Sequence, residues 1–239
     1  ELRGKSDYSI KDSVAKIKEI ILKSEVGAGL NDHGVAFGLY DFNQGMISRG
    51  KKAVNGAEIY IEEDKDQYYH LVIIAKNKEG YKTLSRILTQ SASNQNNQEE
   101  KTDLTRPFLK LEELISYPSE NLIVLSAYED GRLDLGTSES DNKLNKIIGW
   151  IGSEDFYLEL QDQSEISEQL NYRIESLAKQ KKLKLVATND YRYLNPDDRE
   201  AMEVIQAIGL KKEKDKSWFL TGENRFFHTS EEGKRFNLP

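Results

Sequence analysis

The sequence predicts an α/β domain whose strands close into a barrel. Short apolar runs recur along the 239 residues, and amphipathic stretches with helical spacing separate them. The runs are almost continuously apolar, as is typical of parallel strands buried on both faces. A barrel is the natural closure for this many strand–helix units.

The expected strands and helices alternate along the chain. Strands are predicted at residues 26–30, 57–61, 69–75, 121–126, 156–160 and 183–188. Helices are predicted at residues 13–22, 81–88, 144–151, 166–177 and 196–208, where apolar residues recur at helical spacing. Ser9 or Asp12 is the expected N-cap of the first helix. Asn195 is the expected N-cap of the last, with Pro196 at its first position and an end near Gly209.

Two polar stretches interrupt this plan. Residues 91–106 are rich in Ser, Asn, Gln and Glu and are interpreted as a mobile surface loop, because strand signals resume after it. Residues 211–216 are charged and begin a C-terminal extension. We therefore expect a barrel domain over residues 1–210 and an extension over residues 211–239.

Composition excludes several classes of protein. The chain has no cysteine, so it has neither disulfides nor thiolate metal ligands. No apolar run approaches the roughly 20 residues of a membrane span. The net charge of -7 is not the basic surplus of a freestanding nucleic-acid binder. A cytoplasmic location is expected.

Candidate site residues follow from the rule that active groups gather at the carboxyl ends of strands. They are Asp32, His33, Glu58, His70 and Asp190. Histidine and carboxylate side chains at such ends suit a di- or trinuclear Zn, Mn or Fe hydrolytic site. Each has a structural alternative: a histidine in a buried strand is often a hydrogen-bonded core residue, and an aspartate at a strand end often caps a turn. Glu58 is harder to explain in this way, because a buried carboxylate needs a cation or donors.

Short motifs in the same order and spacing give the chain a family resemblance. They include Asn31-Asp32-His33-Gly34, Asn55-Gly56-Ala57-Glu58, Tyr69-His70-Leu71, Phe156-Tyr157-Leu158-Glu159-Leu160-Gln161, Val186-Ala187-Thr188-Asn189-Asp190 and Asn224-Arg225-Phe226-Phe227. Together they resemble the PHP (polymerase and histidinol phosphatase) domain of bacterial DNA polymerase III alpha subunits over nearly the whole chain. The resemblance implies a distorted seven-stranded α/β barrel with metal ligands at its strand ends. It also implies a parent DNA-directed DNA polymerase, a nucleotidyltransferase, in which this domain braces the polymerase and contacts the proofreading exonuclease subunit. The extension over residues 211–239 would then lead toward the polymerase palm.

The chain departs from the family at several implied ligand positions. Arg3 and Lys5 stand where the family has a pair of histidines one residue apart, and Arg192 stands where it has another histidine. Tyr128 and Gln163 fall near two further ligand positions. The implied ligands that remain are Asp32, His33, Glu58, His70 and Asp190. Protonated Arg and Lys cannot coordinate a metal, and they can instead neutralise Asp32, Glu58 and Asp190.

Three hypotheses follow. The first is a degenerate, metal-free scaffold and partner-binding domain of a polymerase alpha subunit, with no catalytic residue and no cofactor, that meets DNA only through the parent protein. The second is a Zn- or Mn-dependent phosphoesterase or 3′–5′ exonuclease with a reduced ligand set. The third is a standalone homologue without a polymerase domain. Partners expected under the first are the polymerase domains of the same chain and the exonuclease subunit, and no membrane.

Overall fold

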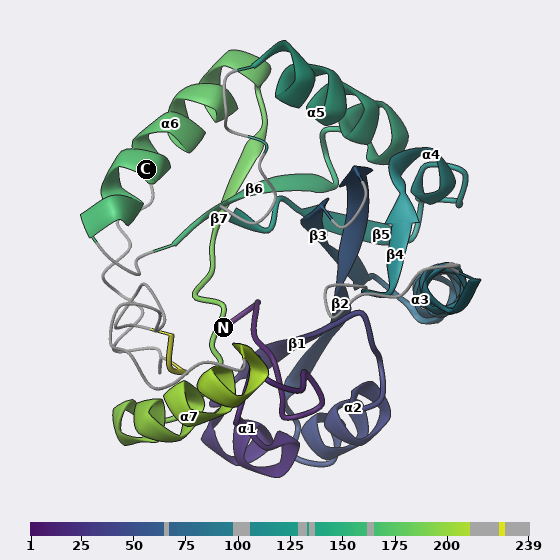
Figure 1. Ribbon diagram of the computed structural model, residues 1–239. Coiled ribbons are helices and arrows are strands. Elements are labelled where there is room, and N and C mark those ends of the chain that lie inside the picture. The colour runs from purple at the N-terminus through teal and green to yellow at the C-terminus, as the bar shows by residue number, and fades with distance from the viewer. Residues whose placement is uncertain are drawn as a thin grey trace.

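The protein is an α/β domain built on one curled sheet. The computed structural model describes residues 1–64, 67–97, 106–128, 133, 137–161, 165–210 and 225–227. The seven strands are β1 (Gly27–His33), β2 (Lys52–Asp64), β3 (Gln67–Ala75), β4 (Phe108–Lys110), β5 (Leu122–Leu125), β6 (Phe156–Leu160) and β7 (Lys184–Ala187). Helices surround the sheet, and the N-terminus lies between β1 and β7 inside the ring (Figure 1). This confirms the predicted α/β class and its barrel-like curvature.

The strand order is β1-β2-β3-β5-β6-β7, and β4 pairs with β2 beside the end of β1. β3 runs antiparallel to β2 and β5, and the other pairs are parallel. The register sets His33 opposite Glu58 across β1 and β2. Parallel strands therefore bring their carboxyl ends, and the side chains there, to one edge of the sheet.

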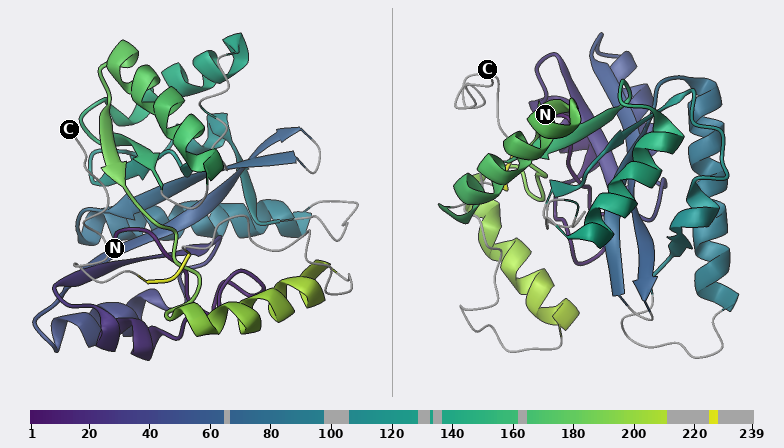
Figure 2. Two further views of the ribbon diagram at one scale, coloured as in Figure 1. Left: turned by 90° about the vertical axis from the view of Figure 1, so that its left-hand side faces the viewer. Right: turned by 90° about the horizontal axis from the view of Figure 1, so that it is seen from above.

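The helices are α1 (Ile17–Lys23), α2 (Leu39–Ile47), α3 (Lys78–Asn97), α4 (Leu111–Leu114), α5 (Ser138–Ile151), α6 (Glu165–Lys181), the 3₁₀ helix η2 (Pro196–Asp198) and α7 (Arg199–Leu210). They pack on the outside of the curl, as the two turned views show (Figure 2). Asn195 caps η2 with a capping box, and α7 follows directly, as the sequence predicts. The sequence did not predict α2, α4 or β4.

Two local predictions were wrong. The predicted loop over residues 91–106 begins as helix, because α3 continues to Asn97; residues 98–105 lie outside the described residues. Polar side chains hold this last stretch: Asn94 Nδ2 donates to Glu113 Oε2 at 2.9 Å, and Ser91 is buried. Neither Ser9 nor Asp12 caps the first helix, which begins after Lys16. Both instead turn toward the strand ends, where carboxylate and imidazole groups need partners.

The N-terminal segment, residues 1–5, fills the gap between β1 and the chain that follows β7. Gly29 and Asn31 donate their backbone N–H groups to residues Glu1 and Gly4, and the Lys5 N–H donates to the Tyr191 carbonyl. Glycine permits this close passage, because a Cβ on Gly29 would lie 1.9 Å from the Leu2 carbonyl oxygen. The curl is thus closed by an irregular segment instead of a regular strand.

The C-terminal strap, defined here as residues 225–227, lies along the chain after β7. Tyr193 and Phe226 form a parallel bridge, and the Phe227 N–H donates to the Tyr193 carbonyl at 3.0 Å. Phe227 is buried with its ring 5.0 Å from that of Tyr191. At least this part of the predicted extension therefore belongs to the barrel. In the part of the chain that the structure describes, no helix is long and apolar enough to cross a membrane.

Candidate functional site: a buried charge pocket

All five remaining ligand-type residues lie at one end of the sheet. Asp32 and His33 end β1, Glu58 lies on β2, His70 lies on β3, and Asp190 follows β7. Glu58 and Asp190 are almost completely buried. The strand order explains the convergence, because β1, β2 and β3 are neighbours and the N-terminal segment links β1 to Asp190. The sequence identified these residues, and the fold brings them into one neighbourhood.

Glu58 uses both carboxylate oxygens. Oε1 contacts His33 Nε2 at 2.8 Å and His70 Nδ1 at 2.7 Å. Oε2 contacts Arg3 Nη2 at 2.8 Å and Lys5 Nζ at 2.9 Å. A carboxylate can accept about four hydrogen bonds. The four nitrogen atoms around Glu58 therefore occupy its acceptor sites. Burial tends to raise the pKa of Glu58, but the charges of Arg3, Lys5 and His33 hold it well below its usual value.

Asp190 and Glu58 are called here the carboxylate hubs, because each carboxylate contacts several cationic side chains. Its Oδ1 pairs with Lys5, and its Oδ2 accepts from Arg192 Nη2 at 3.0 Å and from Arg225 Nη1 at 3.0 Å. Burial tends to raise the pKa of Asp190, but Arg3, Lys5 and Arg192 together depress it. The backbone at Asp190 is left-handed, with φ of 51°, a conformation that Asp tolerates better than most residues. This backbone aims the carboxylate at four cationic side chains.

Asp32 is held by hydroxyl and amide groups. Ser6 donates from its N–H to Oδ1 at 2.7 Å and from its Oγ to Oδ2 at 2.8 Å, and Ser9 Oγ donates to Oδ1 at 2.6 Å. The sequence predicted that Arg3, Lys5 or Arg192 would pair with Asp32. Among the described residues, Ser6 and Ser9 donate to it instead. Burial raises the pKa of Asp32 in spite of these bonds.

His33 is clamped between two carboxylates. Its Nδ1 lies 2.8 Å from Asp12 Oδ2, and its Nε2 lies 2.8 Å from Glu58 Oε1. Ionised carboxylates only accept, so two carboxylate neighbours favour the protonated ring, in which both nitrogens donate. Burial alone would lower the pKa of His33, but the Glu58 and Asp12 carboxylates outweigh it and raise that pKa. A histidine expected as a metal ligand is thus a further cation.

Two buried charged residues of the pocket, Glu159 and Arg225, were missed from the sequence. Glu159 on β6 accepts from Thr188 Oγ1 at 2.7 Å and lies 3.6 Å from Arg3 Nη1, and its burial raises its pKa. Arg225 comes from the C-terminal strap. A carboxylate inside an apolar run marked Glu58, and the same signal is present at Glu159. Nothing local in the sequence distinguishes Arg225 from a surface arginine.

The five substituted positions have different outcomes. Arg3, Lys5 and Arg192 line the pocket and pair with its carboxylates, as expected for Glu58 and Asp190. Tyr128 is buried, and its hydroxyl donates to the Ser167 carbonyl at 3.3 Å, so it lies against α6. Gln163 lies outside the described residues.

The spacing of the nitrogen and oxygen atoms in this pocket can be compared with that of metal ligands. Zn–N and Zn–O bonds of about 2.0–2.2 Å in tetrahedral geometry set neighbouring ligand atoms about 3.4 Å apart. The nitrogens of His33 and His70 are 2.8 and 2.7 Å from Glu58 Oε1, which are hydrogen-bond distances. The nitrogens of Arg3 and Lys5 meet the carboxylate oxygens that metals would bind. The described donors are therefore arranged as ion pairs.

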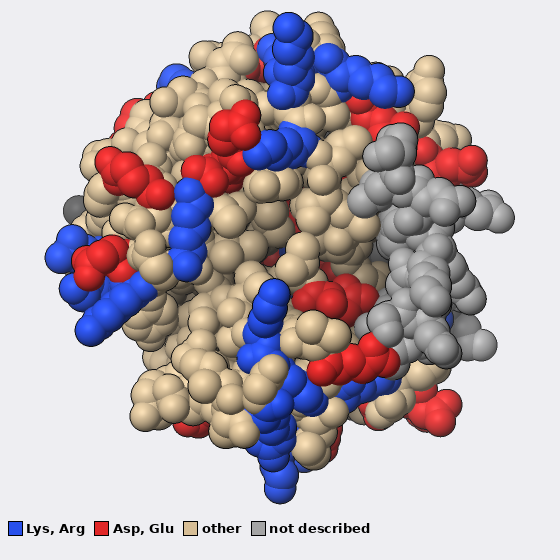
Figure 3. All heavy atoms as spheres, turned by 180° about the vertical axis from the view of Figure 1, so that it is seen from behind, with Lys and Arg blue, Asp and Glu red and all other residues tan. Residues whose placement is uncertain are grey.

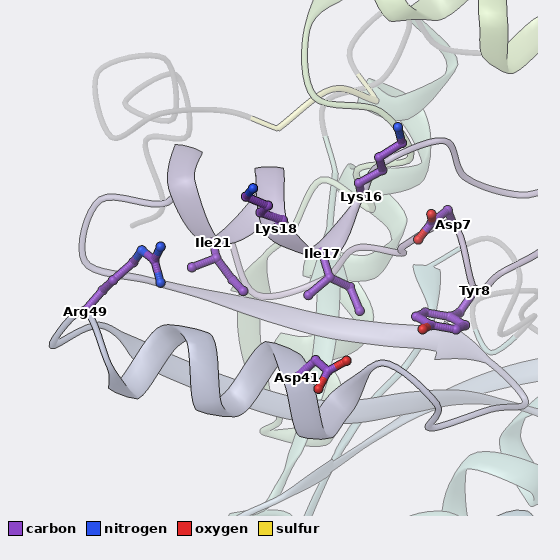
Figure 4. A pocket seen from close by; sticks show the side chains of 8 residues that line it. All are labelled: Asp7, Tyr8, Lys16, Ile17, Lys18, Ile21, Asp41 and Arg49. Carbon is purple, nitrogen blue, oxygen red and sulfur yellow. The ribbon is translucent and has the colours of Figure 1, made fainter.

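A surface cavity of about 390 Å³ lies away from this pocket, between α1 and α2 (Figure 4). Tyr8, Ile17 and Ile21 line it together with three cations and two acids: Lys16, Lys18, Arg49, Asp7 and Asp41. None of the residues that line it is one of the five candidate ligands.

Two solved structures and a family model show which family of proteins the chain resembles. The fold is similar to that of a protein of Bifidobacterium adolescentis described as a putative metal-dependent phosphoesterase, with a TM-score of 0.50 at 12% identity over 80% of this chain and 87% of that one. An amidohydrolase from Chromobacterium violaceum gives a TM-score of 0.53 at 11% identity, over the same shares. A family model for the PHP domain matches residues 1–163. The chain belongs to the PHP domain family.

Sequence relatives narrow the comparison. The DNA polymerase III alpha subunit of Borreliella burgdorferi is 32% identical over 95% of this chain and 21% of its own length. That of Aquifex aeolicus is 32% identical over 87% of this chain and 19% of its own. The chain thus spans about a fifth of the length of the curated relatives it matches, and it is homologous to the PHP region of those subunits.

Proposed function

We propose that this chain is the PHP domain of a replicative DNA polymerase alpha subunit, and that its pocket is a non-catalytic structural core. The observation that carries the proposal is Glu58, whose two oxygens meet four nitrogen donors. Two of these donors, Arg3 and Lys5, are cations that cannot coordinate a metal. Such ion pairs avoid leaving buried carboxylates unpaired, whether or not they add net stability.

Partners and location belong to the same proposal. The domain braces the polymerase part of its own chain and binds a proofreading exonuclease subunit in the cytoplasm. DNA is contacted through the rest of the protein. In support, Figure 3 shows acidic and basic side chains interspersed on one face of the domain, with basic groups at the top, at the left and at the lower centre, and no uniform basic field.

Metal analysis tests the proposal directly. The purified chain is incubated with Zn²⁺ or Mn²⁺, passed through a desalting column and assayed by elemental analysis, beside the Arg3→His/Lys5→His double variant. We expect well under one ion per wild-type chain and more in the variant, because the substitution replaces two cations with neutral ligands. One or more tightly held ions per wild-type chain would refute the non-catalytic core.

One observation favours a second candidate, a metal-dependent phosphoesterase. His33, Glu58 and His70 each offer a ligand atom, and these atoms lie within 4.8 Å of one another. An ion bound there would activate water for attack on a phosphodiester. This candidate requires hydrolysis of a chromogenic phosphodiester or a DNA 3′ end that chelator and His70→Ala both abolish. A lack of hydrolysis with Zn²⁺, Mn²⁺ and Mg²⁺ eliminates it.

A further inference from the structure

The C-terminal strap reaches the pocket from far along the chain. The Arg192 N–H donates to the Arg225 carbonyl at 2.8 Å, and the Phe227 N–H donates to the Tyr193 carbonyl at 3.0 Å. Asn189 Nδ2 donates to the Phe226 carbonyl at 2.7 Å. These bonds add the strap as a short strand beside the chain that follows β7.

The strap sends one charged side chain inward. Arg225 is 5% exposed, and its Nη1 lies 3.0 Å from Asp190 Oδ2, 35 positions away in the chain. Phe227 packs against Tyr191 and Phe226 against Tyr193. Aromatic packing attaches the strap, and a one-residue shift in either direction would remove the guanidinium from Asp190, with Phe226 in its place for one direction. The arginine therefore fixes the register.

Asp190 joins both ends of the domain. Its Oδ1 faces Lys5 of the N-terminal segment, and its Oδ2 faces Arg225 of the strap. Backbone hydrogen bonds join the same two segments to the chain after β7. The Lys5 N–H donates to the Tyr191 carbonyl, and the Arg192 N–H donates to the Arg225 carbonyl. One carboxylate thus lies between two segments from opposite ends of the sequence.

We infer that the pocket is an anchor for the strap, with Arg225 as the positioning residue and Asp190 as its receptor. Residues 225–227 are thereby tied to the pocket and, through Asp190, to the N-terminal segment. This anchor does not depend on whether the domain serves a polymerase.

Amide hydrogen exchange measured by NMR on the whole chain tests this. In Arg225→Gln we expect protection of the Arg192 and Phe227 amides to fall about ten- to a hundredfold, the size of a hydrogen bond to a charged group. The Ile73 amide in β3 and the Lys5 amide should keep their protection. Arg86→Gln, which removes an exposed arginine on α3, is the matched control and should change none of them.

Unchanged protection at Arg192 and Phe227 would overturn the inference, as would an equal loss at Ile73 or the same change in Arg86→Gln. Arg225→Lys provides a milder variant if Arg225→Gln does not fold. It keeps the charge but lacks the planar fork, so a smaller loss confined to the strap amides is expected. A loss spread over β3, or no loss at all, would again overturn the inference.

Discussion

The two halves of the pocket neutralise buried carboxylates by different means. The Glu58 half, formed by Glu58, His33 and His70, sets two imidazole rings against one carboxylate, and the pKa of His33 is raised there. The Asp190 half, formed by Asp190, Arg192 and Arg225, depends on guanidinium groups that do not release a proton. Arg3 and Lys5 lie between the two halves. The cations of the Asp190 half therefore keep their charge at all ordinary pH values. The charge of the Glu58 half changes when His33 gains or loses a proton.

The largest effect is expected at Asp190. Asp190→Asn leaves Lys5, Arg192 and Arg225 without their shared buried anion, so the free energy of unfolding should fall by about 3–5 kcal/mol. Urea denaturation monitored by circular dichroism measures it. Asp155→Asn, which removes the partly exposed partner of Lys76, is the control and should cost at most about 1 kcal/mol. A similar loss in both variants would show that the buried carboxylate of Asp190 contributes no more to stability than a partly exposed one.

The next effect concerns His33. His33→Gln removes an imidazolium that contacts two carboxylates, and we expect a loss of about 1.5–3 kcal/mol in the same urea assay. His70→Gln is the matched variant in the same half and should cost less, because His70 is 17% exposed and Glu58 is its partner in the network among the described residues. If His70→Gln costs more, the clamp on His33 is not the main support of Glu58.

A smaller effect should appear as pH is changed. The pKa of His33 is raised above its ordinary value of 6.5 in the folded chain. Its charge therefore contributes stability that is fully present below pH 6.5 and is lost as pH rises through the folded pKa. Urea unfolding between pH 6 and 9 should show this decline, and His33→Gln should remove it. A decline that persists in His33→Gln would assign the effect to another group.

The smallest effect sets the scale for an ion pair outside the pocket. Arg199 Nε lies 3.1 Å from Glu203 Oε1, one helical turn away on α7. Arg199→Ala should lower the free energy of unfolding by no more than about 0.5 kcal/mol, the usual size of such a pair. A loss comparable to that of Asp190→Asn would mean that burial does not distinguish the pocket.

Much of the fold was predictable because its signals are local. The apolar runs marked β2, β3, β5, β6 and β7, and Asn195-Pro196 marked the start of the last helical region. Helix α3 runs further than predicted, because side-chain bonds such as Asn94 to Glu113 hold a polar sequence that resembles a loop. The short strand β4 depends on pairing with β2, which no local pattern shows.

The sequence by itself determined the family, the two carboxylate hubs, and the presence of Arg3, Lys5 and Arg192 at positions where the family resemblance implies histidines. Only the tertiary structure decided which charges meet. Lys5 and Asp190 are 185 positions apart, and Arg225 and Asp190 are 35 apart. Pairing across such separations depends on the closure of the barrel by the N-terminal segment and the strap. The free energy of a buried charge depends on what surrounds it in space, and neighbours in sequence do not set those surroundings.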